Sequence, residues 1–378
     1  MNYRDLANPG VFDQPIYVPG KPLNAVAEEH GLALESIDKL ASNENPFGPS
    51  PAAIRAIKAA LPNLNLYPDG SCHALKSDLA ELHRINSDQI FVGNGSNEII
   101  ELLGHVFLRP GTEVVVGTYS FIVYRLVAEL FGAKVVDVPM YNFKHDLKAM
   151  ANAVTDKTRI VFVASPNNPT GMANDSRELI EFIDRLPDHV ILCFDEAYAE
   201  YLTDPPDLKP MLKQGHKIVF LRTFSKIFGL GGLRLGFAYG HSDLIALLNR
   251  VRQPFNVNAL AQIGGRAALR DDAFLEHCRR ENERGKIQLI EGLKRLNYTV
   301  YGGSANFVFV DVGDGQVVFE RLQEQGIIVR PLANYGLPEY IRVTIGREEQ
   351  NDRFLLILQK LFGSRDSVGD QSDLINRG

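Results

Sequence analysis

Short apolar runs rich in β-branched residues recur along the first two thirds of the chain, and a stretch with helical periodicity follows each of them. The runs cover residues 90–93, 113–116, 134–138, 159–164, 189–194, 217–221 and 235–239. They are apolar almost throughout instead of alternating, which is typical of strands buried on both faces. Strands that alternate with helices predict an α/β fold, with a mostly parallel sheet sandwiched by helices over residues 45–260.

The pattern changes after residue 260. A long charged amphipathic stretch over 271–296 precedes apolar runs at 298–301, 305–311, 327–330 and 340–345, which predicts a smaller α+β domain over residues 261–364. Residues 1–44 contain Pro9, Pro15, Pro19 and Pro22 and predict an irregular N-terminal arm that packs with the small domain. Residues 365–378 are polar and aperiodic, and they predict a disordered tail.

Composition narrows the class of protein. The 378 residues include 46 acidic and 40 basic ones, for a net charge of −6, and 45% are hydrophobic. These values predict a globular chain, and an acidic chain without a Lys/Arg block predicts no nucleic-acid partner. No apolar run approaches the ~20 residues that span a membrane, and the first residues lack the form of a signal peptide. The scattered Cys72, Cys193 and Cys278 form no disulfide framework or zinc ligand set, so we expect a cytoplasmic enzyme without a metal.

A glycine-containing turn follows the first predicted strand of the sheet. The sequence Gly93-Asn94-Gly95-Ser96-Asn97-Glu98 opens a helical run, and free N–H groups at the start of a helix bind anions. A dinucleotide-binding turn requires glycine where Glu98 stands, so a single phosphate monoester fits better. A tight structural turn would explain the glycines equally well.

Two further motifs follow predicted strands. The loop 165–171, Ser-Pro-Asn-Asn-Pro-Thr-Gly, is stiffened by two prolines and orients the amide of Asn168 at a strand end, where open α/β sheets bind ligands. Asp195 emerges from an apolar strand, where a carboxylate needs a cationic partner, and Tyr198 lies three residues beyond. A helix cap is the alternative explanation for Asp195.

The segment 223–236 is the most specific motif. Lys226 lies among hydroxyl and apolar residues in a glycine-rich loop, and Arg234 follows eight positions later. A partly desolvated lysine is a nucleophile that forms Schiff bases with carbonyl compounds. Arg330 and Arg342 lie in apolar runs of the small domain, where a guanidinium usually binds a carboxylate or an anionic ligand.

The order and spacing of these motifs resemble those of the fold-type I pyridoxal 5′-phosphate (PLP) aminotransferases, and most closely the histidinol-phosphate aminotransferases. The resemblance runs from about residue 12 to 364. The residues that carry it are 16–22, 40–46, 67–69, Thr118, Tyr119, Asn168, Asp195, Tyr198, Ser225, Lys226, Arg234, Arg330 and Arg342.

The resemblance implies a role for each site residue. Lys226 is implied to bind PLP covalently and, once freed, to move a proton between the substrate and the cofactor. Asp195 is implied to keep the pyridine nitrogen protonated. Tyr198 and Asn168 are implied to hydrogen-bond the phenolic oxygen of the ring, and Tyr119 to stack on its face.

The resemblance also implies a phosphate site and an oligomeric state. The residues implied to hold the PLP phosphate are Gly95, Ser96, Asn97, Thr223, Ser225 and Arg234. Tyr67 is implied to reach that phosphate from the neighbouring subunit, so the resemblance implies a homodimer with shared active sites.

The implied reaction transfers an amino group between histidinol phosphate and 2-oxoglutarate, in histidine biosynthesis. Arg342 is implied to bind the glutamate α-carboxylate, and Arg342 and Arg330, with Tyr17, to bind the substrate phosphate. Asn306 is implied to line the same pocket. The alternatives are a phenylalanine or tyrosine aminotransferase and a PLP decarboxylase of a phosphorylated amino acid. A nicotinamide dehydrogenase would leave Lys226 unexplained, and a PLP-fold regulator would need an added DNA-binding domain.

Overall fold

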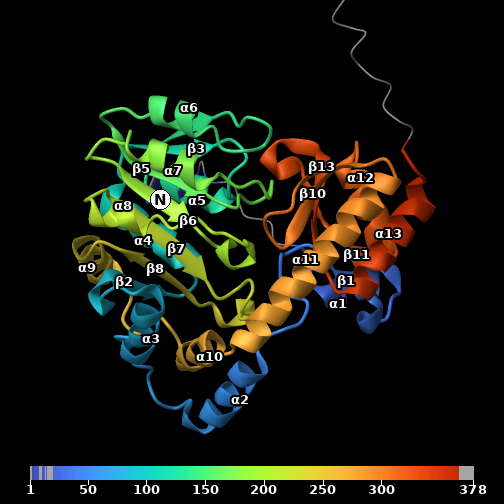
Figure 1. Ribbon diagram of the computed structural model, residues 1–378, viewed down its shortest axis with the longest axis horizontal. Coiled ribbons are helices and arrows are strands. Elements are labelled where there is room, and N and C mark those ends of the chain that lie inside the picture. Colours follow the sequence, from blue (N-terminus) through green and yellow to red (C-terminus); the bar gives the residue numbers. More distant parts are fainter. Residues whose placement is uncertain (1, 8–10, 13, 15–19, 366–378) are drawn as a thin grey trace, which may run out of the picture. The chain divides into compact units, whose positions relative to one another are not determined.

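The structure is a computed structural model that describes residues 2–7, 11–12, 14 and 20–365 (Figure 1). The chain divides into two compact units. Unit 1 comprises Met1–Pro19 and Glu44–Arg279, and unit 2 comprises Gly20–Asn43 and Arg280–Gly378.

Unit 1 is built on a seven-stranded sheet in the order β2-β8-β7-β6-β5-β3-β4. Its strands are β2 (Ile90–Gly93), β3 (Glu113–Gly117), β4 (Lys134–Val138), β5 (Thr158–Ala164), β6 (Ile191–Asp195), β7 (Ile218–Thr223) and β8 (Gly236–Gly240). All neighbours are parallel except β8, which is antiparallel to β2 and β7. Each of the seven apolar runs therefore forms a strand, and the predicted α/β fold with a mostly parallel sheet is confirmed.

Alternate side chains of these strands enter two separate cores. Val115, Val161 and Leu192 belong to one core, with residues of α3, α6, α7, α8 and α10. Ile160 and Cys193 belong to the other, with residues of α4, α5 and α9. The central strands of the sheet are thus buried on both faces, which explains why they are apolar at almost every position.

Two helices of unit 1 precede the first strand of this sheet in the sequence, and the others come between its strands or after them. They are α2 (Pro51–Ala60), α3 (His73–His83), α4 (Ser96–Phe107), α5 (Ile122–Leu130), α6 (Leu147–Asn152), α7 (Ser176–Ile183), α8 (Lys209–Lys213), α9 (Ser242–Val251) and α10 (Ala259–Leu269). Helix α11 (Asp272–Arg295) starts in unit 1 and ends in unit 2.

Short 3-10 helices occur in both units. They are η1 (Tyr3–Asp5), η3 (Leu34–Ser36), η4 (Leu61–Asn63), η5 (Ser87–Gln89), η6 (Ala199–Tyr201), η7 (Gly231–Leu233) and η8 (Ala333–Tyr335).

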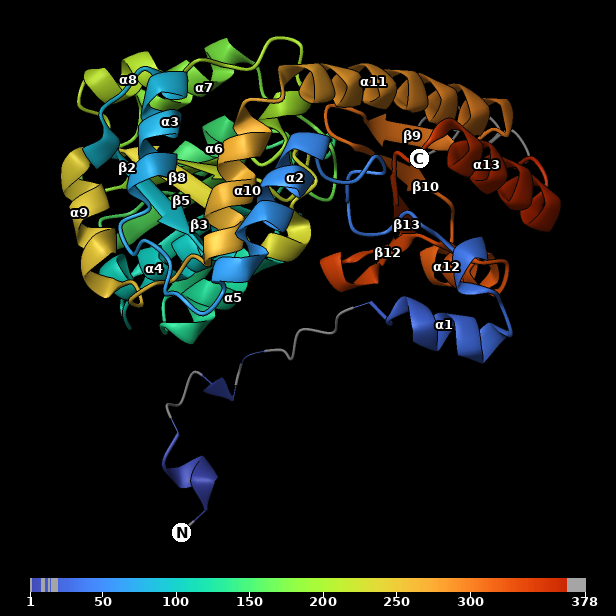
Figure 2. The same ribbon diagram turned by 90° about the horizontal axis from the view of Figure 1, so that it is seen from below.

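Unit 2 contains a four-stranded antiparallel sheet in the order β12-β13-β10-β9, with helices on one face (Figure 2). Its strands are β9 (Thr299–Gly302), β10 (Phe307–Asp311), β12 (Arg330–Leu332) and β13 (Leu337–Thr344). A two-stranded sheet pairs β1 (Asp38–Lys39) with β11 (Ile327–Ile328), and the helices are α1 (Leu23–His30), α12 (Gly315–Glu324) and α13 (Glu348–Phe362). Side chains of α11, α12 and α13 share one hydrophobic core with β10 and β13.

Two predictions from the sequence need correction. The expected irregular arm contains the regular elements α1 and β1, because its four prolines end at Pro22, which is the residue that caps α1. The unit boundary lies inside α11 and not at residue 260, because α10 packs with unit 1, where its Gly264 approaches Ile57 of α2. Residues 366–378, most of the expected tail, lie outside the described residues.

None of the helices in the described ranges has the length and apolar character needed to cross a bilayer.

Candidate active site

Several strand ends of unit 1 meet at one edge of the sheet. Strands β5, β6 and β7 are parallel, so their last residues, Ala164, Asp195 and Thr223, lie at the same edge. Strand β8 runs the other way, and its first residue, Gly236, pairs with both Gly93 and Thr223. The loops that carry the predicted motifs are therefore adjacent, at the edge where parallel sheets bind ligands.

A cavity of about 190 Å³ opens at this edge. Nine residues that the sequence singles out line it: Ser96, Asn97, Asn168, Asp195, Tyr198, Thr223, Ser225, Lys226 and Arg234. These residues come from four separate segments of the chain, and the outermost two, Ser96 and Arg234, are 138 positions apart.

One end of the cavity is suited to an anion. The N-terminus of α4 lies there, and its cap residue Gly95 has φ 80°. A β-carbon on Gly95 would lie 2.6 Å from Nη2 of Arg234, so the guanidinium lies against the helix start. Free N–H groups, the dipole of α4 and a guanidinium together favour a phosphate group at this end.

The other end of the cavity holds Asp195, whose side chain is buried. Its Oδ2 accepts a hydrogen bond of 2.6 Å from the hydroxyl of Tyr124, and its Oδ1 accepts one of 2.9 Å from the backbone N–H of Ala197. Burial raises the pKa of Asp195, and these two hydrogen bonds lower it in part. A carboxylate in this setting is stabilised by a cationic ligand group, such as a protonated ring nitrogen.

Lys226 also lines the cavity. Its Nζ is 5.6 Å from the centre of the Tyr198 ring, and its positive charge lowers the pKa of Asp195. Tyr198 is buried at 4% exposure, so its hydroxyl is held close to the cavity. A primary amine beside a phosphate site and a buried carboxylate can react with the carbonyl of a small phosphorylated ring compound.

A buried network of charges supports the loops that carry Asp195 and Thr223. Arg222 pairs with Glu196 at 2.9 Å and with Glu200 at 3.0 Å. The hydroxyl of Tyr239 donates a further hydrogen bond of 2.9 Å to Glu196. Because Glu196 follows Asp195 and Arg222 precedes Thr223, the ion pair between Arg222 and Glu196 fixes the two strand ends relative to each other.

Some predicted residues lie elsewhere. Tyr119 is half-buried and is not among the residues that line the cavity, although its backbone carbonyl accepts a hydrogen bond from Asn167. Tyr67 is 84% exposed and stacks on Phe255. Tyr17 lies outside the described residues. The roles of Tyr119 and Tyr67 stay predictions.

The sequence analysis missed two aromatic residues of the cavity. Phe121 and Tyr124 line it from the start of α5, two and five positions after Tyr119. Phe121 is the cap residue of α5 and Tyr124 lies in the first turn of this largely apolar helix, where no local pattern separates it from a core tyrosine. Only its hydrogen bond to Asp195 reveals its place in the site.

The predicted arginines lie in unit 2. Arg330 and Arg342 are direct partners across β12 and β13, so their side chains leave the sheet on the same face. Nη2 of Arg342 donates to the carbonyl of Ala41 at 2.6 Å. Two guanidinium groups directly opposite each other repel, so this arrangement favours an anion between them.

Asn306 immediately precedes β10 in the same unit and is buried. Its Nδ2 donates to the carbonyl of Asn43 at 3.0 Å, whereas its buried Oδ1 has no hydrogen-bond partner among the residues that the structure describes. A buried amide oxygen without a partner costs free energy, which a ligand with an N–H or O–H group would recover.

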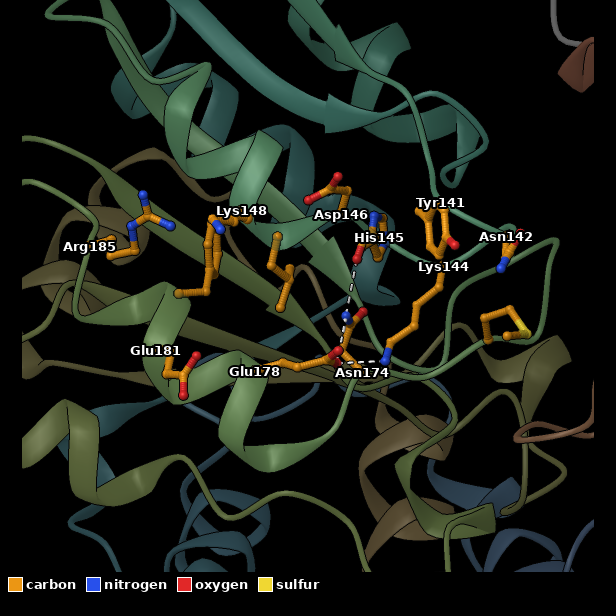
Figure 3. Close-up of a pocket in the computed structure, with 13 residues that line it drawn as sticks. Tyr141, Asn142, Lys144, His145, Asp146, Lys148, Asn174, Glu178, Glu181 and Arg185 are labelled. Carbon is orange, nitrogen blue, oxygen red and sulfur yellow. Dashed lines mark hydrogen bonds and ion pairs between the residues drawn. The ribbon is translucent and has the colours of Figure 1, made fainter.

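A larger cavity of about 610 Å³ lies in unit 1 beside α6 and α7 (Figure 3). Lys144 pairs there with Glu178 at 2.6 Å, and Nδ2 of Asn174 donates to the carbonyl of His145 (Figure 3). The charged groups of its wall are balanced, and none of the residues singled out from the sequence lines it. The smaller cavity is therefore the candidate site.

Comparisons with known proteins agree with this geometry. The family model described as aminotransferase class I and II matches residues 36–358. Histidinol-phosphate aminotransferase 2 of Nitrosospira multiformis is 44% identical to this chain, over 94% of this chain and 91% of the relative. Histidinol-phosphate aminotransferase 2 of Pseudomonas fluorescens is 45% identical, over 95% of this chain and 98% of the relative. The solved structure of histidinol-phosphate aminotransferase from Sinorhizobium meliloti in complex with PLP has a TM-score of 0.86 and 23% identity, covering 94% of this chain and 98% of that one, which shows a shared fold.

Proposed function

The chain belongs to the class I and II aminotransferases, and from this membership we propose that it transfers an amino group between histidinol phosphate and 2-oxoglutarate, with PLP as its cofactor. The proposal rests on identity of about 45% to histidinol-phosphate aminotransferases over nearly the whole chain. The single structural observation that carries it is a cavity holding an amine, a buried carboxylate and a phosphate cradle.

The residues of this cavity fit PLP. The cofactor is a pyridine ring with a phosphate arm and an aldehyde, and when bound it withdraws electrons from a substrate carbon so that a proton can leave it. The glycine at the start of α4 leaves room for a phosphate against Arg234, since a β-carbon on Gly95 would collide with that side chain. The buried carboxylate of Asp195 at the other end suits the ring nitrogen.

We assign the following roles to the chain's own residues, and their shared place in the wall of the cavity supports these assignments. Lys226 provides the amine that holds the cofactor, and when free it carries the proton to and from the substrate carbon. Asp195 keeps a proton on the ring nitrogen through charge pairing. Tyr198 and Asn168 donate to the phenolic oxygen of the ring, and Ser96, Thr223 and Ser225 supply polar groups to the phosphate.

The face of the ring needs an aromatic partner. The resemblance assigns this role to Tyr119, and Phe121 lines the cavity two residues later. Both stay candidates, and the loss of PLP affinity in Tyr119→Ala and Phe121→Ala separates them. The larger loss identifies the stacking residue.

The substrate phosphate is assigned to the two arginines of unit 2. Their cross-strand pairing places two positive charges on one face of the sheet, and two guanidinium groups bind an oxyanion in two-point fashion. A carboxylate in one half-reaction and a phosphate in the other can both use Arg342. The uncharged tail of phenylalanine or tyrosine would leave Arg330 without a function. We assign Asn306 and Tyr17 to the same site.

A comparison of amino donors tests the proposal. With 2-oxoglutarate as acceptor, kcat/KM for histidinol phosphate should exceed that for phenylalanine and tyrosine. A higher value for either aromatic amino acid would make the chain an aromatic aminotransferase. Release of carbon dioxide from a phosphorylated amino acid, without transamination, would make it a decarboxylase.

Arg330→Ala tests the phosphate site itself. A hydrogen bond to a charged group contributes about 1.5–3 kcal/mol, so kcat/KM for histidinol phosphate should fall about 10- to 100-fold while that for glutamate changes little. Arg321→Ala on α12, an exposed arginine paired only with Glu324 across 3.7 Å, is the matched control. An equal loss on both substrates would contradict the role given to Arg330.

The active form is proposed to be a homodimer. Tyr67 is 84% exposed within one chain, as expected for a side chain that serves a neighbouring subunit. Leu61, Leu64, Leu66 and Phe255 are also exposed, by 46–63%, which supports an apolar interface near Tyr67. A dimer in light scattering, and weaker PLP binding in Tyr67→Phe, are the expected results.

We also propose a cytoplasmic location. The three cysteines, Cys72, Cys193 and Cys278, are all buried free thiols, which is consistent with a reducing compartment. A fluorescent fusion of the full chain in bacterial cells should distribute through the cytoplasm.

A further inference from the structure

Tyr124 makes a short side-chain hydrogen bond to Asp195, the proposed partner of the ring nitrogen. Its hydroxyl donates to Oδ2 of Asp195 at 2.6 Å, while Oδ1 accepts from the N–H of Ala197 at 2.9 Å. The two donors bind different oxygens of one carboxylate. Together they fix both the position of the carboxyl group and its rotation about the side-chain bond.

The ring of Tyr124 is itself held rigidly. It lies on α5 with 1% exposure and stacks on Phe162, with ring centres 4.5 Å apart and planes 8° from parallel. Phe121 packs edge-on against it at 5.7 Å. A tyrosine fixed in this way can aim its hydroxyl at only one acceptor, so the hydrogen bond is directional.

The hydrogen bond also affects charge. Burial raises the pKa of Asp195, the Tyr124 hydroxyl is the largest of the influences that lower it, and Glu196 next door raises it. Burial and the nearby Asp195 raise the pKa of Tyr124 well above its usual value, so the phenol stays protonated and remains the donor. The backbone N–H of Ala197 and the positive charge of Lys226 also lower the pKa of Asp195.

We propose that Tyr124 is a positioning residue for transamination: its hydroxyl orients the Asp195 carboxylate and favours its charged form. This inference rests on the proposed PLP-dependent function. One proton is shared between the carboxyl group and the ring nitrogen, and a donor already on Oδ2 disfavours a proton there. The proton therefore resides on the ring nitrogen, where it makes the ring the stronger electron sink.

Tyr124→Phe removes only the hydroxyl and keeps the stacked ring. The matched control is Tyr239→Phe, which removes a buried hydroxyl that donates at 2.9 Å to Glu196, a carboxylate that does not line the cavity. Both variants lose one buried hydrogen bond to a carboxylate, so they should lose similar thermal stability. Only Tyr124→Phe should weaken PLP binding, by about tenfold or more.

Two readouts separate a positioning role from a structural one. The first is the absorbance of the bound cofactor as a function of pH, which should shift in Tyr124→Phe and not in Tyr239→Phe. The second is the split of kinetic parameters: kcat should fall while KM for histidinol phosphate changes little. A double-mutant cycle with Asp195→Asn adds a third measure, because Tyr124→Phe should have little further effect once the carboxylate is absent.

The outcomes are distinct. The inference is overturned if Tyr124→Phe binds PLP as tightly as Tyr239→Phe with an unchanged spectrum, or if its effect adds fully to that of Asp195→Asn. If the unaltered chain binds no PLP, the proposed function itself fails, and this inference fails with it. A thermal unfolding scan of each apoenzyme checks that both tyrosine variants are folded when they are compared.

Discussion

Gly236→Ala should weaken PLP binding by disturbing the start of α4. A β-carbon at residue 236 would lie 2.5 Å from the backbone nitrogen of Ser96 and 2.7 Å from the backbone carbonyl carbon of Gly95. Both are backbone atoms and cannot rotate away, so the helix start must move. Overpacking of this kind costs about 1–3 kcal/mol, and losing one hydrogen bond to the phosphate costs a similar amount. We expect the Kd for PLP to rise about 10- to 100-fold.

Titration of the apoenzyme with PLP, followed by absorbance or fluorescence, measures this change. Gly232→Ala in the same loop region is the control, because a β-carbon there meets nothing within 4 Å. Thermal unfolding shows whether each variant is folded. If folded Gly236→Ala binds PLP as tightly as Gly232→Ala, the PLP phosphate is not held at the start of α4, and the proposed phosphate site is wrong.

Two further predictions concern buried charge. Arg222→Leu should destabilise the fold by about 3–5 kcal/mol at neutral pH, since it leaves the carboxylates of Glu196 and Glu200 buried without their partner. In urea unfolding, the difference in free energy of unfolding between the unaltered chain and Arg222→Leu should shrink as the pH falls toward 5, because the two carboxyl groups can then be protonated. A difference that stays constant with pH would contradict this prediction. Burial lowers the pKa of His83 to about 3, so the folded state excludes a proton that the unfolded chain binds near pH 6.5. Neutral His83 therefore contributes stability above pH 6.5, and this contribution is lost as the pH falls from 6.5 toward 3. In His83→Phe, the free energy of unfolding should change less steeply with pH over this range, by about 1.4 kcal/mol per pH unit. An unchanged slope would contradict the prediction.

The sheet could be predicted because strands that are buried on both faces appear in the sequence as short runs of apolar residues. Strands such as β5 and β6 contain almost only apolar residues, and the last residue of β6 is Asp195, directly after the buried Phe194. The site could be predicted for a related reason: its polar residues lie at strand ends, where parallel topology brings them to one edge.

The remaining features depend on packing that no local pattern records. Tyr124 occurs in an apolar helix, and its hydrogen bond to a residue 71 positions away exists only in the folded chain. The placement of α10 in unit 1 depends on close approach of Gly264 to Ile57, which composition does not reveal. The regular structure of α1 was hidden by the prolines that precede it.

Borohydride reduction of the PLP-loaded enzyme, followed by peptide mapping, tests the central claim most directly. The cofactor mass should appear on the peptide that contains Lys226, and Lys226→Ala should show no labelled peptide. Labelling of another lysine, such as Lys144 or Lys148 of the larger cavity, or no labelling at all, would contradict the assignment of the active site.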